Sequence, residues 1–112
     1  MISDKIKLTN SEIKEIISKI QNSDKIMFID RKEETGERPM SFFLEAGIEY
    51  KDAIEIIRKL NFNDYQYTQL DKTMKYIYMH IFFKNIQNKE AYIKIGFKSD
   101  KTIVISFHER EY

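Results

Sequence analysis

The sequence predicts an α+β fold in which N-terminal helices pack on one face of a small antiparallel β-sheet. Two stretches in the first half carry apolar residues at helical spacing. Three stretches in the second half are rich in β-branched and aromatic residues and are separated by short polar turns. With 112 residues, 42% of them hydrophobic, the chain is expected to form one domain over residues 1–112 with a modest core.

The first helix is predicted after Thr9, because Thr9 and Glu12 have the spacing of a capping box. Residues 22–24 (Asn-Ser-Asp) are expected to end this helix. A short strand is predicted next, over residues 25–29. The apolar residues that define the helix recur three and four positions apart: Ile13, Ile16, Ile17 and Ile20.

Residues 30–39 are expected to form a charged loop, which holds the only proline. A short helix is predicted over residues 40–47 and should stop at Gly47. A longer helix is predicted over residues 49–60, with Ala53, Ile56, Ile57 and Leu60 on one stripe. These two helices would precede the sheet and pack against it.

Three strands are predicted over residues 74–83, 91–97 and 102–108, joined by hairpin-length connections at 84–90 and 98–101. Alternation along each strand separates an apolar set from a mixed set. The apolar sets are expected to share the face beneath the helices: Ile77, Met79, Ile81 and Phe83; Ile93, Ile95 and Phe97; Ile103, Ile105 and Phe107. The mixed sets would place Tyr78, His80, Tyr92, Lys94, Ser106 and His108 together on the opposite face.

The composition excludes several classes of site. The chain has no cysteine, so it forms neither disulfides nor thiolate metal sites. It has no apolar run long enough for a membrane span and no signal-peptide pattern, and a cytoplasmic location is expected. Net charge is +1, with 11 basic and 14 acidic residues in 1–71 and 8 basic and 4 acidic in 72–112. The C-terminal third is therefore the part expected to face anions.

The mixed face has two interpretations. It can be the solvated side of a sheet, where Tyr, Lys, Ser and His serve solubility alone. It can also cleave RNA without a metal or cofactor, because histidine can act as base or acid near neutral pH. Lys94 would then stabilise the charge on phosphate, and Tyr78 and Tyr92 would donate hydrogen bonds or stack on bases. No metal site is expected, since no third ligand accompanies His80 and His108 on that face.

The stretches "AYIKIGF…TIVISFHE", "LEAGIEYKDAIEIIRKLNFNDYQYT" and "FIDRK" resemble the MqsR-type toxins of bacterial toxin–antitoxin systems. The resemblance covers roughly residues 25–110. It implies the RelE-like toxin fold and a metal-independent endoribonuclease (an mRNA interferase) that cleaves single-stranded mRNA and arrests growth. It also implies a cognate antitoxin protein as partner.

Carried over residue by residue, the resemblance makes Tyr92 and Lys94 part of the family's "Y-[IL]-K" motif, and it places His108 at a catalytic position. Tyr67 stands where the family has a functional lysine, and Met79 stands where it has a functional glutamine. His80, next to Met79, is a possible replacement for the lost group.

Arg31 and Lys32 are also expected to supply positive charge for RNA, and Tyr67 and Tyr78 are expected to contact it. The departures at Tyr67 and Met79 leave an alternative open. In that alternative the chain is a non-catalytic binding module or inhibitor, such as a degenerate toxin or a phage- or plasmid-borne regulator. It would engage a protein partner through the same face.

Overall fold

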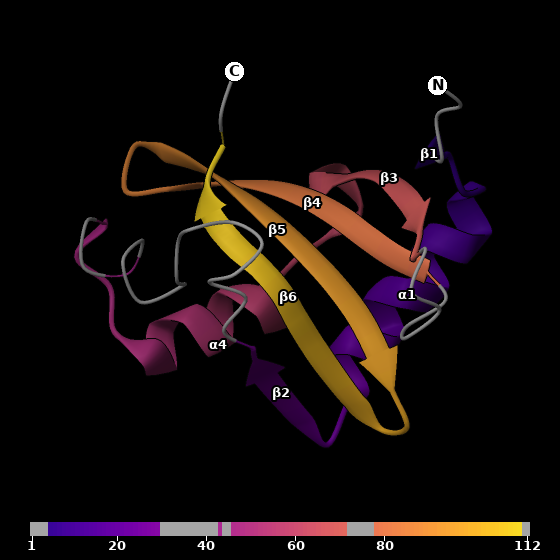
Figure 1. The fold of residues 1–112 in the computed structure, drawn as a ribbon, viewed down its shortest axis with the longest axis horizontal. Helices are drawn as coiled ribbons and strands as arrows, with labels where there is room; N and C mark the ends of the chain where they lie inside the picture. Colours follow the sequence, from indigo (N-terminus) through magenta and orange to yellow (C-terminus); the bar gives the residue numbers. More distant parts are fainter. Residues whose placement is uncertain (1–4, 30–42, 44–45, 72–77, 111–112) are drawn as a thin grey trace.

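The computed structural model describes residues 5–29, 43, 46–71 and 78–110, and it has an α+β architecture (Figure 1). Two helices cover one face of a six-stranded sheet with strand order β1-β3-β4-β5-β6-β2. Neither helix has the length and apolar character that crossing a membrane requires in the part of the chain described. The elements in chain order are β1 (Lys5–Ile6), α1 (Asn10–Asn22), β2 (Lys25–Phe28), α4 (Tyr50–Arg58), the 3-10 turn η1 (Phe62–Asp64), β3 (Tyr65–Leu70), β4 (Tyr78–Ile86), β5 (Lys89–Lys98) and β6 (Lys101–Glu109).

The start of α1 confirms the predicted capping box. The Glu12 amide donates to Thr9 Oγ1 at 3.2 Å, and the Thr9 amide donates to Glu12 Oε1 at 2.9 Å. The helix ends at Ser23, where the backbone becomes extended and the hydroxyl donates to the Ile20 carbonyl at 2.9 Å. The boundaries of α1 therefore follow from local hydrogen bonding that the sequence already specifies.

Helix α4 begins and ends slightly inside the predicted range of 49–60. The Arg58 guanidinium donates to the carbonyls of Gln21 and Ser23, each at 3.2 Å, and so joins the end of α4 to the end of α1. Gly47 has a φ of +72°, the left-handed conformation that favours glycine where a helix ends. The predicted loop at 30–39 and most of the short helix predicted at 40–47 lie outside the described residues.

The sheet is mixed, which corrects the prediction of a purely antiparallel one. Strands β3, β4, β5 and β6 form the expected antiparallel arrangement, but β2 pairs with β6 in parallel at one edge. Strands β1 and β3 were not among the predicted strands. Strand β3 has mostly polar residues and a bulge between Tyr65 and Tyr67, so it lacks the alternation that marks a strand in sequence.

The two central hairpins are tighter than predicted. Ile86 pairs with Lys89 and Lys98 pairs with Lys101, so each connection has only two residues. Gln87 and Asn88 have φ of 51° and 67°, and positive φ at both positions is what a type I′ turn requires. This turn extends β4 and β5 beyond their predicted ends.

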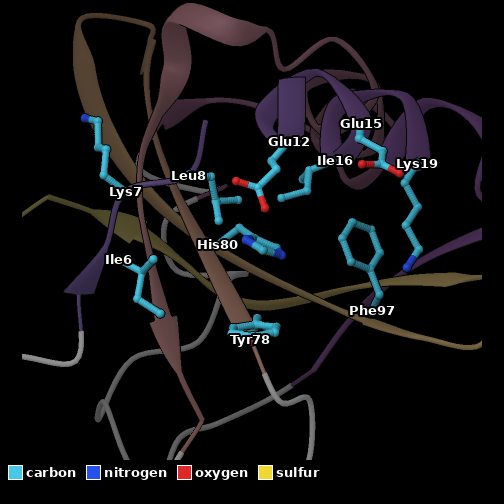
Figure 2. A pocket seen from close by; sticks show the side chains of 10 residues that line it. All are labelled: Ile6, Lys7, Leu8, Glu12, Glu15, Ile16, Lys19, Tyr78, His80 and Phe97. Atoms are coloured by element: carbon cyan, nitrogen blue, oxygen red, sulfur yellow. The ribbon is translucent and has the colours of Figure 1, made fainter. Parts of the chain in front are cut away.

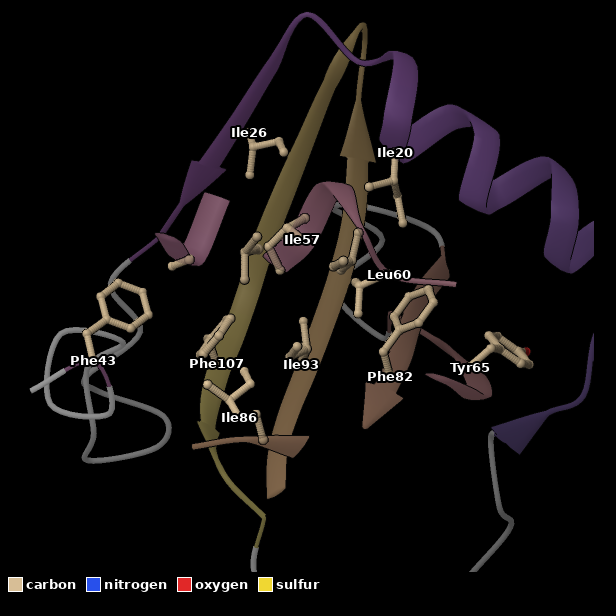
Figure 3. Close-up of a cluster of buried hydrophobic side chains, with 14 of the residues drawn as sticks. Ile20, Ile26, Phe43, Ile57, Leu60, Tyr65, Phe82, Ile86, Ile93 and Phe107 are labelled. Carbon is tan, nitrogen blue, oxygen red and sulfur yellow. The ribbon is translucent and has the colours of Figure 1, made fainter. Parts of the chain in front are cut away.

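The core lies between the sheet and the helices (Figure 3). Ile93 pairs with Phe82 on one side and with Phe107 on the other, so the three side chains form one row across β4, β5 and β6. All three are essentially inaccessible and pack with residues of both helices: Ile13, Ile20, Ala53 and Ile57. Burial of this row stabilises the fold through the hydrophobic effect.

The face predicted for β4 is wrong. Because Phe82 pairs with Ile93, Phe82 and His80 point toward the helices, whereas Ile81 and Phe83 point away from them. We call the side away from α1 and α4 the second face; in Figure 1 both helices lie behind the sheet. In β4 both sets contain large apolar residues, so alternation alone could not decide which one faces the core.

Strand β6 changes face along its length, which the sequence did not predict. A bulge leaves Ile105 without a partner, since Lys94 pairs with Ser106 and Ile95 pairs with Val104. Before the bulge, Val104 belongs to the core beneath the helices, whereas Ile103 lies on the second face. The second face thus carries its own small apolar cluster of Met79, Ile103 and Ile105, with Ile29 packed against it.

Candidate functional site

Three aromatic rings form a row on the second face. Tyr92 pairs with Phe83 of β4 and with His108 of β6, so the three side chains lie side by side across the sheet. The rings of Tyr92 and His108 stack with an interplanar angle of 15° and centroids 5.0 Å apart. Those of Phe83 and Tyr92 are 6.0 Å apart and tilted by 41°. The rings form a continuous aromatic row across three strands, in which Tyr92 has His108 against one face and Phe83 on its other side.

The protonation of the His108 ring is set by the backbone. Nδ1 of His108 lies 2.9 Å from the carbonyl oxygen of Glu109. A carbonyl oxygen can only accept a hydrogen bond, so Nδ1 carries the proton and donates it. In the neutral imidazole the lone pair then belongs to Nε2, which can accept a proton from another group. His108 therefore has the tautomer that a general base needs.

A second row on the same face brings Tyr67, Lys94 and Ser106 beside the first. Tyr67 pairs with Ile81, Ile81 with Lys94, and Lys94 with Ser106. Lys94 Nζ lies 6.0 Å from the centre of the Tyr92 ring, the outer limit for a cation–π contact. We call these two rows the Tyr92–His108 face, consisting of Tyr67, Phe83, Tyr92, Lys94, Ser106 and His108.

The phenol of Tyr92 is held in its protonated form. Burial raises the pKa of Tyr92 well above its usual value, and the neighbouring Tyr67, which shares a hydrogen bond with it, raises the pKa further. Tyr92 is therefore a hydrogen-bond donor throughout the neutral pH range and not a base.

Two further cations adjoin the Tyr92–His108 face, and the sequence analysis did not single them out. The Arg110 guanidinium lies 4.2 Å from the centre of the Phe83 ring and forms an ion pair with Glu90. Lys5 Nζ of β1 lies 4.6 Å from the centre of the Tyr67 ring. Alternation from His108 would have placed Arg110 on this face. Lys5 gave no such signal, because β1 has only two residues.

His80 does not join His108, contrary to the expectation that both histidines share a face. It lies on the helix side, where Nδ1 is 2.8 Å from Thr68 Oγ1 and Thr68 Oγ1 is 2.8 Å from the Tyr65 hydroxyl. Burial, reinforced by the charge of Lys19, lowers the pKa of His80 to about 4. His80 is therefore neutral at physiological pH and is separated from His108 by the sheet.

Tyr78 lies on the same side as His80, and the two line a cavity beside α1 (Figure 2). The structure therefore brings Tyr67, Tyr92, Lys94 and His108 together and leaves Tyr78 and His80 apart from them.

The remaining sequence expectations concern Met79, Arg31 and Lys32. Met79 is buried in the apolar cluster of the second face, beside the Tyr92–His108 face rather than within it. Arg31 and Lys32 lie outside the described residues. Within the ranges that the structure describes, no three His, Asp or Glu side chains lie close enough together to hold a metal ion.

Comparisons with known proteins identify no relative. No protein-family model matches the chain. No curated protein matches its sequence.

Proposed function

We propose that the chain is a metal-independent endoribonuclease that cleaves single-stranded mRNA at the Tyr92–His108 face. The observation that carries the proposal is the pairing of His108 with Tyr92. One ring has its Nε2 lone pair fixed by the Glu109 carbonyl, and the other is a flat surface stacked against it. His108 would supply a base for the 2′-OH proton, and Lys94 would supply positive charge for the phosphate.

In the proposed reaction, Nε2 of His108 takes the proton of a ribose 2′-OH. The 2′-oxygen forms a bond to phosphorus as the bond from phosphorus to the 5′-oxygen breaks. The leaving 5′-oxygen lies opposite the attacking 2′-oxygen, so it takes its proton from water, and the imidazolium of His108 then gives its proton to the hydroxide that remains. The products are a 2′,3′-cyclic phosphate and a 5′-hydroxyl end. Lys94 would stabilise the extra negative charge on the phosphate oxygens.

RNA binding would use the aromatic row and the cations around it. Phe83 and Tyr92 would contact unpaired bases along the outer edge of the row, and aromatic contacts of this kind tolerate any base sequence. Lys5, Lys94 and Arg110 supply positive charge along the edge of the row. This arrangement favours a single strand, whose bases are free to stack on side chains.

The toxin assignment rests on the resemblance to the MqsR-type toxins, with the RelE-like fold as part of the proposal. In the described residues, two helices on one face of a sheet with five antiparallel strands are compatible with that fold. In this proposal the protein acts in the cytoplasm, arrests growth, and is neutralised by a cognate antitoxin protein. Tyr67, at the family's lysine position, would act through the hydroxyl that contacts Tyr92.

A second candidate is a binding module without catalysis, which would engage a protein partner through the second face. Two observations favour it. The other histidine lies across the sheet, so the Tyr92–His108 face has one imidazole only. Next to this face, Met79, Ile103 and Ile105 form an apolar cluster, and Met27 of β2 is 38% exposed. An apolar cluster beside aromatic and cationic residues also suits a protein interface.

The purified chain incubated with an unstructured RNA oligonucleotide in EDTA separates the two candidates. We expect the wild type to cleave the RNA to 2′,3′-cyclic phosphate ends. Lys51→Ala, which changes an exposed cation on α4, should cleave it equally well. His108→Ala should not cleave it. Full cleavage by His108→Ala, or inhibition by EDTA, would overturn the proposal. RNA that neither binds nor is cut, together with a protein partner held through the second face, would establish the binding module instead.

A further inference from the structure

A cavity of about 660 Å³ lies on the helix side of the sheet, between α1 and the start of β4, where Tyr78 and His80 are found (Figure 2). Ligand sites in proteins typically measure roughly 300–1,000 Å³ and are lined by apolar and aromatic side chains with a few polar groups. This cavity has that size and that composition. The sheet separates it from the Tyr92–His108 face, so it is a different site.

The walls of the cavity suit a flat ligand. Tyr78 lines the cavity and is 47% exposed, so its ring is accessible to a ligand. Phe97 forms another wall, with its ring 5.8 Å from that of His80. Leu8 and Ile16 complete an apolar lining. Stacking on an aromatic ring contributes on the order of 1–3 kcal/mol for a nucleobase.

Two polar groups are directed into the cavity from opposite walls. His80 uses Nδ1 for its hydrogen bond to Thr68, and this is the only hydrogen bond that the described part of the chain gives it, so Nε2 remains for a ligand. Glu12 accepts both of its described hydrogen bonds, from the Thr9 amide and hydroxyl, through Oε1. Figure 2 shows the Glu12 carboxylate directed toward the imidazole of His80. Oε2 therefore remains as an acceptor.

The charges around the cavity favour a ligand that donates hydrogen bonds. The capping interaction with Thr9 lowers the pKa of Glu12, which keeps the carboxylate ionised, and Glu15 adds a second carboxylate at the rim. The two lysines that line the cavity are engaged by protein groups. Lys7 Nζ donates to the Gln66 carbonyl at 2.9 Å, and Lys19 Nζ lies 4.5 Å from the centre of the Phe97 ring. An anionic ligand such as phosphate would be repelled by the Glu12 carboxylate. Both lysines already contact protein groups, so neither is placed to offset that repulsion.

From these observations we infer that the cavity binds a planar nitrogen heterocycle that presents N–H donors, of the class of a free nucleobase or nucleoside. The ring would stack on Tyr78, an N–H group would donate to Glu12 Oε2, and His80 Nε2 would make a second polar contact. Guanosine is a suitable probe, because its N1–H or its N2–H group can donate to Glu12 Oε2. This inference does not depend on the proposed ribonuclease activity.

The test is a titration of the full chain with guanosine, in which the backbone amide signals of Leu8 and Phe97 are monitored in NMR spectra. We expect saturable shifts with a Kd below about 1 mM, which corresponds to about −4 kcal/mol. Glu12→Gln keeps the capping box, in which Gln can replace Glu, and removes the charge. Tyr78→Ala removes the stacking surface at an exposed position. Each should weaken binding at least about tenfold.

Glu55→Gln, the same exchange on α4 at an exposed position, is the matched control and should bind as the wild type does. The absence of saturable shifts in the wild type would overturn the inference. So would unchanged affinity in both Glu12→Gln and Tyr78→Ala. Equal affinity for an apolar ring without N–H groups, such as toluene, would also contradict the inference. Binding of guanosine only within an oligonucleotide would contradict it as well.

Discussion

Tyr92 and His108 lie opposite each other on β5 and β6, and their rings are nearly parallel at a centroid distance of 5.0 Å. The stack holds the imidazole nearly parallel to the Tyr92 ring while Nδ1 donates a hydrogen bond to the Glu109 carbonyl. The orientation of His108 is therefore determined by two contacts, one with a side chain and one with the backbone.

The first prediction separates the ring of Tyr92 from its hydroxyl. Tyr92→Ala should weaken the binding of single-stranded RNA by about 1–3 kcal/mol, because a stacking surface is lost. Tyr92→Phe keeps the ring and should retain most of the affinity. Fluorescence anisotropy with a labelled oligonucleotide measures both. Equal losses in the two variants would show that the hydroxyl, and not the ring, makes the contact.

The second prediction concerns the charge of Lys94. If its ammonium group neutralises a phosphate, Lys94→Ala should reduce the slope of log K against log salt concentration by roughly 0.7 for a single strand. Binding should be measured at several salt concentrations, with Lys51→Ala on the helix side as the control. A slope that is unchanged in Lys94→Ala would mean that this lysine does not contact the RNA backbone.

The third prediction concerns the stability of the fold below neutral pH. The pKa of His80 is about 4 in the folded chain, below its ordinary value of 6.5, so the unfolded chain binds the proton more readily. The stability contributed by neutral His80 is present above pH 6.5 and is lost as the pH falls toward 4. The loss should reach roughly 3 kcal/mol.

Urea unfolding at pH 7 and at pH 4.5 measures that loss. His80→Asn provides the comparison, since its amide can replace Nδ1 toward Thr68 and does not titrate. The difference in stability between the two pH values should be smaller in this variant. If it is the same as in the wild type, other groups account for the acid sensitivity.

The fourth prediction concerns the core. Ile93 is fully buried between Phe82 and Phe107, so Ile93→Ala should lower the free energy of unfolding by about 2–5 kcal/mol. Met27→Ala removes a side chain that is partly exposed at the edge strand β2, and it should cost much less. Urea unfolding of both variants tests the assignment of the helix-covered face. Similar losses would contradict it.

The sequence predicted the parts of the fold that local chemistry determines. The capping box of Thr9 and Glu12 is confirmed, as are α4 and the antiparallel order of β4, β5 and β6. These features depend on residues close together in the chain. The parallel pairing of β2 with β6 is a contact between segments far apart in the sequence, and no local pattern predicts it.

The site was predicted in part for the same reason. Tyr92, Lys94 and His108 share a face because alternation held along β5 and along the end of β6. His80 was assigned to the wrong face because both alternating sets of β4 contain large apolar residues, so alternation did not decide between them. The hydrogen bond with Thr68 on the neighbouring strand offsets the cost of burying His80, and it could not be predicted without the strand pairing.

In the middle of β6, the bulge at Ile105 makes the number of residues more important for the strand's orientation than the identity of the side chain. The segment before it is anchored by Val104 in the core, and the segment after it is anchored by Phe107. Both anchors and His108 keep their orientations only while one unpaired residue separates them. Another apolar side chain at position 105 would preserve that spacing. Removal of the residue would force one half of the strand to turn over, exposing an anchor and carrying His108 through to the side of the helices.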